Sequence, residues 1–279
     1  MPNPGPFTRA QLAELGIRTT QLKHLMAAGQ LRRVRRGWYA NVFSPDDAVR
    51  AVQLGGRLGC LSACKWRGIW VPQHNDLHVM LNPGARKPSG GIQQVQFHRL
   101  ARACTVAVAP ALESLGHVLH RHDAETALVV LESAVNLGLL HEAAARQLLS
   151  SAPARARGSV QYFSPLAQSG SETRLRLFFQ RRGVAVQPQA FIPDVGQVDL
   201  LVGKSWIIEA DSKAHHSAPR NVSIDCERDF NARALGYTRD RLSYEQIWQS
   251  WPRTQQWLSA VLAGRRHLRQ PIPLRIATG

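Results

Sequence analysis

Three acidic residues lie in two short apolar segments near the C-terminal end of this 279-residue sequence. Asp199 belongs to the segment QVDLLVG, and Glu209 and Asp211 belong to WIIEADS. The connection between them, residues 203–205, has the sequence Gly-Lys-Ser, which suits a tight turn. The whole pattern predicts a β-hairpin that brings the acids together.

A hairpin centred on Lys204 would place Asp199 opposite Glu209, with Asp211 projecting from the same face as Glu209. Opposed side chains lie about 4.5–5.5 Å apart at Cβ, and like charges at that distance destabilise a sheet unless a cation stands between them. A divalent metal ion would relieve this repulsion, and carboxylate oxygens suit Mg²⁺ or Mn²⁺ better than zinc. A shift of one residue in register would move Asp199 to the other face.

The alternative interpretation treats Asp199 and Asp211 as solvated residues at strand ends. Glu209 argues against it, because this residue follows the apolar run 206–208, where an unpaired carboxylate would be unfavourable. The acids therefore favour a functional site.

The elements that precede the hairpin can also be predicted. The stretch SETRLRLFFQRRG predicts a helix over residues 171–183, with Ser171 as its cap and Gly183 at its end. Three apolar residues mark its buried face: Leu175, Phe178 and Phe179. The following residues, 184–192, predict a strand bent at Pro188.

These residues together resemble a family of nucleases. Glu172 on the helix, then Asp199, then Glu209-Ala-Asp211 are similar to the PD-(D/E)XK nuclease superfamily, specifically to its very-short-patch-repair-like branch. The downstream stretch DCERDFNARALGY continues the resemblance, which covers residues 169–250, about a third of the chain. The implied fold is a restriction-endonuclease-like α/β/α core with a mixed sheet.

The resemblance implies a role for each acid. Asp199 and Glu209 would ligate Mg²⁺ or Mn²⁺, Asp211 would complete the shell, and Glu172 would hold a metal-bound water. The metal would lower the pKa of the attacking water and neutralise charge on the scissile phosphate.

Basic residues just after the acids complete the implied site. Lys213 or His215 would stabilise the developing charge or protonate the leaving oxygen. The superfamily's usual lysine is replaced by Asp211 here, and the branch's usual glycine by Ser212. Lys213 supplies the positive charge only if the strand continues to it, and His215 with His216 fits a surface histidine pair equally well.

Residues 8–40 predict a helix-turn-helix followed by a basic ribbon. Thr8 and Gln11 have capping-box spacing, and Gly16 closes the first helix. Thr19 is the expected cap of a second helix that ends at Gly29. Four residues at the start or outer face of the second helix would meet DNA: Thr20, Gln21, Lys23 and His24.

The segment LRRVRRGWYA alternates around Gly37 and predicts a wing with four arginines: Arg32, Arg33, Arg35 and Arg36. The first 40 residues carry seven basic residues and one acidic residue, a balance of +6. This places positive charge where a recognition helix and a wing would meet DNA. The alternative is a solvated basic hairpin that has no ligand.

Residues 8–40 also resemble the winged-helix N-terminal domain of antitoxins from abortive-infection toxin–antitoxin systems. The most specific part is the ending, where basic residues are followed by Gly37, Trp38 and Tyr39. The resemblance implies binding to double-stranded DNA, including the protein's own promoter, and a toxin or another defence protein as a further partner.

Residues 45–158 predict mainly helices, over 46–59, 61–68 and 124–150, with a strand at 77–81. Cys60 and Cys64 are spaced i, i+4, with His74 and His78 downstream, a pattern that a zinc site would use. Buried cysteines more often serve as small apolar residues. The remaining histidines of this region show no tight ligand spacing and are expected at the surface or in the core.

Charge and hydropathy narrow the function further. The chain has 35 Lys and Arg against 19 Asp and Glu, a net charge of +16, which indicates a polyanionic partner such as nucleic acid. The apolar runs are too short to cross a bilayer, and the N-terminus lacks the continuous apolar stretch of a secretory signal. A cytoplasmic protein that does not bind membranes is expected.

The predicted fold class is a multidomain α+β or α/β protein with a winged helix (1–44), a mostly helical middle domain (45–158) and a PD-(D/E)XK endonuclease-like domain (159–279). The leading hypothesis is a metal-dependent DNA endonuclease that acts in repair or defence. The alternative is a non-enzymatic transcriptional regulator that keeps a degenerate nuclease fold, and a third option is RNA as substrate. The oligomeric state and the target sequence are left open.

Overall fold

The computed structural model describes residues 5–88, 93–100, 105–211 and 219–274. Its contacts divide the chain into two compact units. The first comprises residues 1–130 and 151–156, and the second comprises residues 131–150 and 157–279. None of the described helices combines the length and apolar character needed to span a membrane.

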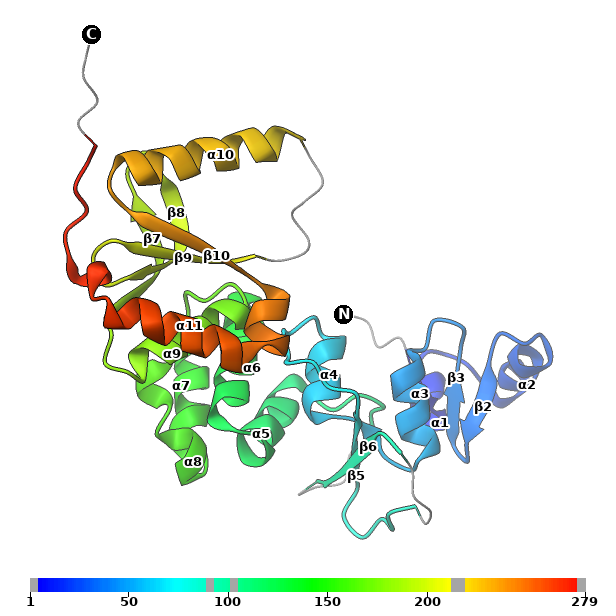
Figure 1. The fold of residues 1–279 in the computed structure, drawn as a ribbon. Coiled ribbons are helices and arrows are strands. Elements are labelled where there is room, and N and C mark those ends of the chain that lie inside the picture. The colour runs from blue at the N-terminus through cyan, green and yellow to red at the C-terminus, as the bar shows by residue number, and fades with distance from the viewer. Residues whose placement is uncertain (1–4, 89–92, 101–104, 212–218, 275–279) are drawn as a thin grey trace. The chain divides into compact units, whose positions relative to one another are not determined.

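The N-terminal part of the first unit is a small sheet with two helices (Figure 1). The elements are β1 (Phe7–Thr8), α1 (Arg9–Glu14), α2 (Thr19–Ala27), β2 (Arg32–Arg35) and β3 (Trp38–Ala40). The sheet has the order β1-β3-β2, and Gly37, with φ of +79°, lies in the turn between β2 and β3. This is the predicted arrangement of two helices followed by a β-wing.

The predicted capping box of α1 is confirmed, because Thr8 and Gln11 bond reciprocally at its start. Thr19, in contrast, does not cap α2. The N-cap is Arg18, which makes no side-chain cap hydrogen bond. The reason is that the Thr19 hydroxyl accepts a hydrogen bond from the Arg9 guanidinium, at 3.1 Å, and so faces the turn between the helices.

The rest of the first unit contains a second three-stranded sheet among helices. Its elements are α3 (Asp46–Gln53), β4 (Arg57–Leu58), α4 (Cys60–Trp66), β5 (Leu77–Leu81), β6 (Val95–Arg99) and α5 (Ala111–Arg121), followed by α6 (Ala124–Asn136). The sheet order is β4-β5-β6, with β5 and β6 parallel. The strand predicted at 77–81 is confirmed as β5.

The helix predicted over 46–59 is shorter than expected. It ends at Gln53, and Arg57–Leu58 form β4 instead. Two glycines account for this end. Gly55 has a left-handed φ of +86°, and a Cβ on Gly56 would lie 2.4 Å from the Val79 side chain, so only glycine lets the chain approach β5 this closely.

The second unit contains the predicted α/β/α domain. The elements from residue 142 onwards are α7 (Glu142–Ser151), α8 (Ala154–Arg157), η1 (Val160–Tyr162), α9 (Gly170–Gln180), β7 (Val186–Ile192), β8 (Gly196–Val202), β9 (Trp206–Asp211), α10 (Pro219–Ala234), β10 (Thr238–Ser243), η3 (Glu245–Gln249), α11 (Trp251–Ala263) and η4 (Arg266–Leu268). Residues 154–156 of α8 belong to the first unit, and residues 131–136 of α6 belong to the second. The sheet has the order β10-β9-β8-β7, with β10 parallel to β9 and the other pairs antiparallel.

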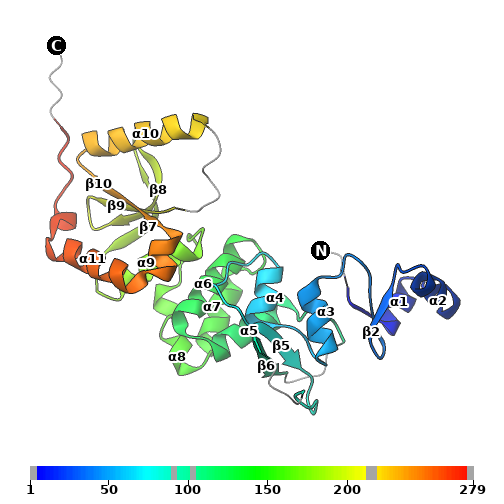
Figure 2. The same cartoon turned by 45° about the vertical axis from the view of Figure 1, so that its right-hand side comes forward.

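Helices cover both faces of this sheet. Figures 1 and 2 show α9 and α11 on one face and α10 on the other. The core between α9, α11 and the sheet includes Leu175, Phe179 and Trp206, whereas the core under α10 includes Ile207 and Ala232. The mixed sheet between two helical layers confirms the predicted fold class.

The alternation of side chains along β8 breaks at Asp199. Leu200 and Val202 belong to the core under α9, whereas Val198 belongs to the core under α10, although residues two apart in a regular strand share one face. On the neighbouring strand, Gln189 has a left-handed φ of +51°. Pro188 stays in the ladder opposite Leu200, so the irregularity lies at Gln189 and not at Pro188 as predicted.

The cap of α9 also differs from the prediction. The N-cap is Ser169, whose hydroxyl accepts from the Glu172 backbone N–H at 3.2 Å. Ser171 lies inside the helix, where its hydroxyl accepts from the Trp248 indole at 3.0 Å. The buried face predicted from Leu175, Phe178 and Phe179 is confirmed.

Candidate functional site

The predicted DNA-contacting residues of the N-terminal domain are all exposed. On α2 these are Thr20, Gln21, Lys23 and His24, and on the wing they are Arg32, Arg33, Arg35 and Arg36. Leu22 on the opposite face of α2 is buried against Phe7, Leu12 and Leu31. The amphipathic helix therefore buries one face in its own core and presents the other, polar face to solvent.

The wing is fixed to α1 by its backbone. The Arg9 backbone N–H donates to the Gly37 carbonyl at 3.1 Å, and the Arg9 side chain donates to the Ile17 carbonyl at 2.9 Å. One arginine thus ties the wing turn to the turn between the two helices. Arg9 therefore connects the wing to the turn that precedes the predicted recognition helix.

The four arginines of the wing are not equivalent. β2 has a bulge between Arg33 and Arg35. Beyond the bulge, the Arg35 guanidinium lies close to Gly55, and a Cβ on Gly55 would be only 2.1 Å from it. Arg35 and Arg36 also border a small pocket of about 210 Å³ that contains Arg57. The Arg35 guanidinium is therefore close to another segment of the protein, at Gly55. Arg32 and Arg33 lie before the bulge and are exposed.

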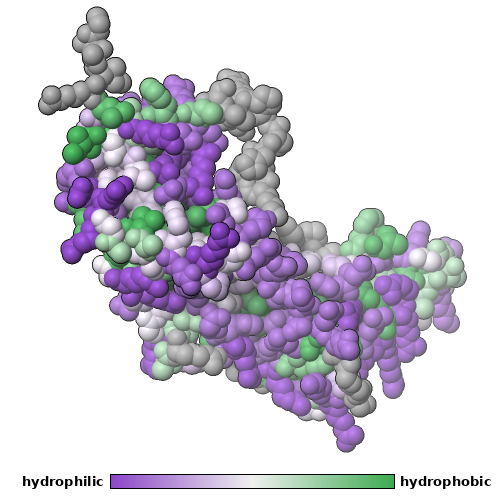
Figure 3. All heavy atoms as spheres, viewed as in Figure 1, coloured by the Kyte–Doolittle hydropathy of each residue, from purple (hydrophilic) through white to green (hydrophobic). Residues whose placement is uncertain are grey.

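Apolar side chains are also exposed on the N-terminal domain. Figure 3 shows green patches there, among the mainly hydrophilic residues of this face. The exposed apolar residues of the domain are Leu15, Met26, Val42 and Phe43. Leu15, Val42 and Phe43 border an apolar pocket of about 510 Å³ next to the domain's own core.

In the C-terminal domain, Glu172 lies buried in the first turn of α9. Its Oε2 atom accepts from the Gln168 backbone N–H at 3.0 Å and from the Gln189 side-chain amide at 2.8 Å. Burial raises the pKa of this carboxyl, and the hydrogen bonds from Gln168, Ser169 and Gln189 only partly offset the effect.

Asp199 lies where β8 and β9 separate. The predicted register of the hairpin is confirmed for Val202 opposite Trp206 and Leu200 opposite Ile208. The ladder ends there, so Asp199 and Glu209 do not form the next pair. Instead, the Asp199 carboxylate accepts a hydrogen bond from the Ala210 backbone N–H at 2.9 Å. The N–H of Ala210 is thus bonded to a side chain of β8 and not to its backbone.

The electrostatic surroundings of Asp199 are unfavourable to its charged form. Burial, together with the nearby Glu172 and Glu209 carboxylates, raises its pKa to about 7, although hydrogen bonds from Ala210 and Gln189 partly offset the effect. Gln189 interacts with both Asp199 and Glu172. The buried Glu172 and the half-buried Asp199 are therefore linked through one amide side chain.

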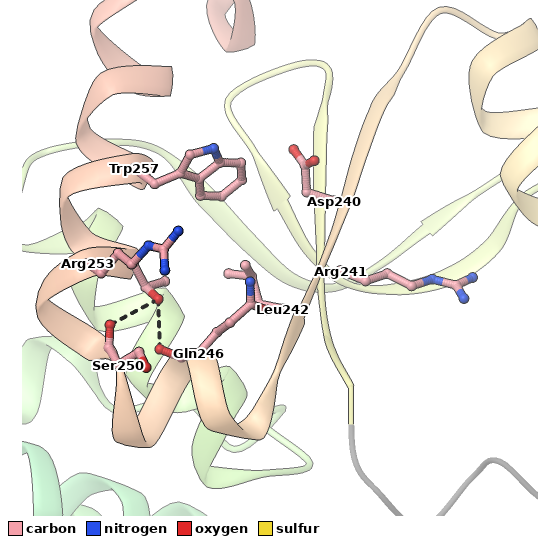
Figure 4. A pocket seen from close by; sticks show the side chains of 8 residues that line it. Asp240, Arg241, Leu242, Gln246, Ser250, Arg253 and Trp257 are labelled. Carbon is pink, nitrogen blue, oxygen red and sulfur yellow. Dashed lines mark hydrogen bonds between the residues drawn. The ribbon is translucent and has the colours of Figure 1, made fainter.

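Glu209 has a different environment, because arginines surround it. Its carboxylate lies 2.5 Å from the Arg239 guanidinium and 3.4 Å from those of Arg228 and Arg241. Figure 4 shows that Arg241 projects from the side of β10 opposite to Asp240, as the alternation of a strand requires. The cationic partner of Glu209 in this structure is thus a group of guanidinium side chains.

The other predicted site residues have mixed outcomes. Asp211 ends β9, is half-buried and lies opposite Ser243 in the parallel ladder. Lys213, His215 and His216 lie outside the described residues, so their predicted roles stay predictions. The described structure therefore brings Glu172 and Asp199 together and holds Glu209 in an arginine cluster.

The fit to a divalent metal can be tested on these acids. The buried Glu172 and the half-buried Asp199 supply oxygens that suit Mg²⁺ or Mn²⁺. Burial is the main cause of their raised pKa values, and a nearby cation would favour the charged carboxylates. Among the described residues, however, no three acidic side chains bring their oxygens within 4.8 Å of one another. The carboxylates of Asp199 and Glu172 are suitable ligands for Mg²⁺ or Mn²⁺. The carboxylate of Glu209 instead forms ion pairs with three arginines.

Several residues of this region were missed by the sequence analysis. Gln189 carries no charge and drew no attention, although its position on β7 opposite Asp199 follows once the β7–β8 register is known. Arg239 and Arg241 are two apart on a strand, and this spacing was the available signal for a basic face.

A pocket of about 470 Å³ lies between β10 and α11, and Arg253, Trp257 and Asp240 are among its lining residues (Figure 4). The Asp240 carboxylate accepts from the buried Trp206 indole at 2.8 Å. None of the residues predicted for chemistry lines this pocket. It is separate from the Glu172–Asp199 pair.

One family model matches the N-terminal domain. Residues 3–42 match the family model of the transcriptional regulator, AbiEi antitoxin. The N-terminal domain is similar to this antitoxin family. The match covers the helix-turn-helix and wing but not residues 43–279, which make up more than four fifths of the chain, and it confirms the resemblance inferred for this part.

Comparisons over the rest of the chain add little. No curated protein is significantly similar to the sequence. A crystal structure of the RV2827C protein from Mycobacterium tuberculosis is similar at 17% sequence identity, covering 66% of this chain and 78% of that protein, with a TM-score of 0.29. The proposed relationship of the C-terminal domain to nucleases is untested by these comparisons.

Proposed function

We propose that the protein binds double-stranded DNA through its N-terminal winged helix and acts as a transcriptional regulator of the antitoxin type. The observation that carries the proposal is the family match over residues 3–42. The exposure of the polar face of α2 and of the basic wing in the same segment agrees with it. The family is described as an antitoxin, so a toxin partner belongs to the same proposal.

Electrostatics support binding to the DNA backbone. The first 40 residues carry seven basic residues and one acidic residue. Lys and Arg contacts to phosphates release condensed counterions, which makes affinity fall steeply with salt. Side chains on the exposed face of α2 would then read base edges in the major groove.

The test measures duplex binding by the full-length protein as a function of salt. Changing Arg32, Arg33, Arg35 and Arg36 together to Ala should flatten the plot of log affinity against log salt by about 0.9 for each lost phosphate contact. The matched control removes four exposed arginines of the second unit: Arg157, Arg253, Arg265 and Arg269. An unchanged slope in the wing variant, or an equal change in the control, would overturn the proposal.

A second candidate function is metal-dependent DNA cleavage by the C-terminal domain. The observation that favours it is a pair of carboxylates, the buried Glu172 and the half-buried Asp199, at the point where β8 and β9 separate within a mixed α/β/α sheet. Asp199 and Glu172 would hold Mg²⁺ or Mn²⁺, which would supply charge neutralisation at the scissile phosphate and acidify a bound water. Gln189 would orient both carboxylates.

Plasmid nicking or linearisation with Mg²⁺ or Mn²⁺, with EDTA controls, tests this candidate. Asp199→Asn should abolish cleavage while leaving duplex binding through the N-terminal domain intact. Mn²⁺ should also raise the melting temperature of the wild type but not of the variant. If the wild type neither cleaves DNA or RNA nor gains stability from Mn²⁺, the protein is a non-enzymatic regulator.

A further inference from the structure

A group of metal-ligating side chains lies in the first unit and includes Cys60 and His78, two of the four residues whose spacing a zinc site would use. Cys60, His78 and His98 are buried, and one potential ligand atom from each lies within 4.8 Å of the other two. Within the described part of the chain, no other set of three His, Cys, Asp or Glu residues meets this condition. We propose that Cys60, His78 and His98, with His122 as fourth ligand, form a structural Zn²⁺ site.

The four residues come from four different elements that meet at one place. Cys60 begins α4, His78 lies on β5, His98 lies on β6, and His122 follows the last residue of α5. Figures 1 and 2 both show α4, α5, β5 and β6 gathered in this part of the first unit. A metal ion here would join segments up to 62 residues apart in sequence.

Two of the distances between ligand atoms are slightly shorter than those of a tetrahedral site. The Cys60 sulfur lies 3.3 Å from His122 Nε2, and His78 Nδ1 lies 2.9 Å from His98 Nε2. Zn–N bonds of about 2.0–2.1 Å and Zn–S bonds of about 2.3 Å give ligand separations of about 3.3–3.6 Å around a tetrahedral ion. Outward movements of a few tenths of an ångström within these two pairs, with a larger turn of the His122 ring towards His78 and His98, would admit Zn²⁺.

The local backbone is built to bring Cys60 to the histidines. Cys60 has a left-handed φ of +49°, a conformation that a non-glycine residue rarely adopts and that often marks functional positions. The preceding Gly59 donates its N–H to the His78 carbonyl at 3.0 Å, and a Cβ on Gly59 would lie 1.9 Å from Met80. Only glycine allows α4 to begin this close to β5.

A buried hydroxyl fixes the second ligand. The His78 backbone N–H donates to the Ser62 side chain at 3.0 Å, which holds β5 against the first turn of α4. His78 and Met80 are two residues apart on β5, so their side chains lie on the same face of the sheet. Met80 lies opposite His98 in the parallel ladder. The two histidines therefore share one face of the sheet, with their rings stacked at a centroid distance of 5.1 Å.

The ligand types indicate which metal ion fits the site. The mixture of thiolate and imidazole ligands favours Zn²⁺ over Mg²⁺ or Ca²⁺.

Zinc content of the full-length protein tests the proposal directly. After removal of metal by a chelator, the wild type is mixed with Zn²⁺, separated by gel filtration and analysed for metal by mass spectrometry. We expect one zinc ion per chain, and a Co²⁺-loaded sample should show the absorption of tetrahedral cobalt with a thiolate charge-transfer band. Cys60→Ser and His98→Asn should each weaken zinc binding at least tenfold.

Matched controls separate this site from its surroundings. Cys64→Ser removes a second buried cysteine one turn further along α4, and His120→Asn removes an exposed histidine near the end of α5. Both controls should keep full zinc binding. Asp199→Asn should keep it too, which separates this site from the candidate Mg²⁺ site of the second unit.

Two outcomes would overturn the proposal. The first is a wild type that binds no zinc after reconstitution. The second is a Cys60→Ser variant that keeps the wild-type stoichiometry and affinity. If Cys60→Ser fails to fold, the wild type alone decides: Zn²⁺ must raise its melting temperature, and its Co²⁺ spectrum must contain the thiolate band.

Discussion

The Asp199 carboxylate accepts a hydrogen bond of 2.9 Å from the backbone N–H of Ala210, the residue after Glu209. This bond shows how the two strands separate. The backbone ladder ends at Leu200 and Ile208, and the Asp199 side chain then takes over one donor of β9. Asp199 consequently faces Glu172 and Gln189, while Glu209 meets arginines of α10 and β10.

Asp199 should make the stability of the protein depend on pH. Its pKa is raised from 3.8 to about 7 in the folded state, so its contribution to stability is fully present below about pH 4 and is lost as pH rises through 7. The loss should amount to roughly 4 kcal/mol at most. Urea unfolding of wild type and Asp199→Asn at pH 4.5, 6 and 7.5, without divalent metal, should therefore show the variant gaining relative stability as pH rises.

The control for this measurement is Asp194→Asn. Asp194 is exposed in the same domain and has a left-handed φ of +65°, which asparagine also adopts readily. The gain of Asp199→Asn with rising pH should exceed any change seen in this variant. A constant difference between Asp199→Asn and wild type would contradict the raised pKa of Asp199.

Glu209→Gln should behave in the opposite way to Asp199→Asn. Removing the Glu209 charge leaves the guanidinium of Arg239, whose side chain is only 4% exposed, with Asp229 as its remaining anionic partner. We expect a loss of about 2–3 kcal/mol in the free energy of unfolding without metal. Chemical denaturation at pH 7.5 measures it, and a variant as stable as wild type would show that the arginine cluster does not depend on Glu209.

Arg33 should contribute more than Arg35 to DNA binding. The Arg35 guanidinium lies against Gly55, whereas the exposed Arg33 precedes the bulge in β2. We expect Arg33→Ala to reduce the salt slope of duplex binding by about 0.9, the value for one phosphate contact, and Arg35→Ala to change it by less than half of that. Fluorescence anisotropy across a salt series measures both slopes, and the reverse order would show that Arg35 leaves Gly55 in the complex.

The buried ion pair of Glu132 and Arg176 should be essential to the C-terminal unit. Both side chains are 1% exposed, and one guanidinium nitrogen lies 2.6 and 2.8 Å from the two carboxylate oxygens. Arg176→Met would leave the Glu132 charge buried with only the neutral donors Thr173 and Ser164. We expect a loss of about 3–5 kcal/mol in the free energy of unfolding.

The double variant Glu132→Leu with Arg176→Met provides the control for that prediction. It removes both charges and should be more stable than Arg176→Met alone, since no uncompensated charge remains buried. Urea denaturation of the two variants and wild type completes the comparison. A double variant less stable than the single one would show that packing, and not charge, dominates at this position.

Patterns between near neighbours in the sequence predicted much of the local structure correctly. The capping box of Thr8 and Gln11, the wing turn at Gly37 and the hairpin around Lys204 all depend on residues a few positions apart. Errors arose where a distant group competed for the predicted partner. Thr19 was expected to cap α2, but Arg9 binds its hydroxyl, and Ser171 was expected to cap α9, but Trp248 binds its hydroxyl.

The sequence by itself determined the basic N-terminal segment and the hairpin around Lys204, because charge, turn residues and periodicity are properties of contiguous residues. The α/β/α class was implied by the resemblance to nucleases. Only the tertiary structure decided which acids meet, since the left-handed Gln189 and the end of the β8–β9 ladder direct Asp199 towards Glu172. The same holds for Cys60 and His98, which have no recognisable spacing in the sequence. Their meeting depends on strand order and on the close approach that Gly59 allows, and these are decided by packing between distant segments.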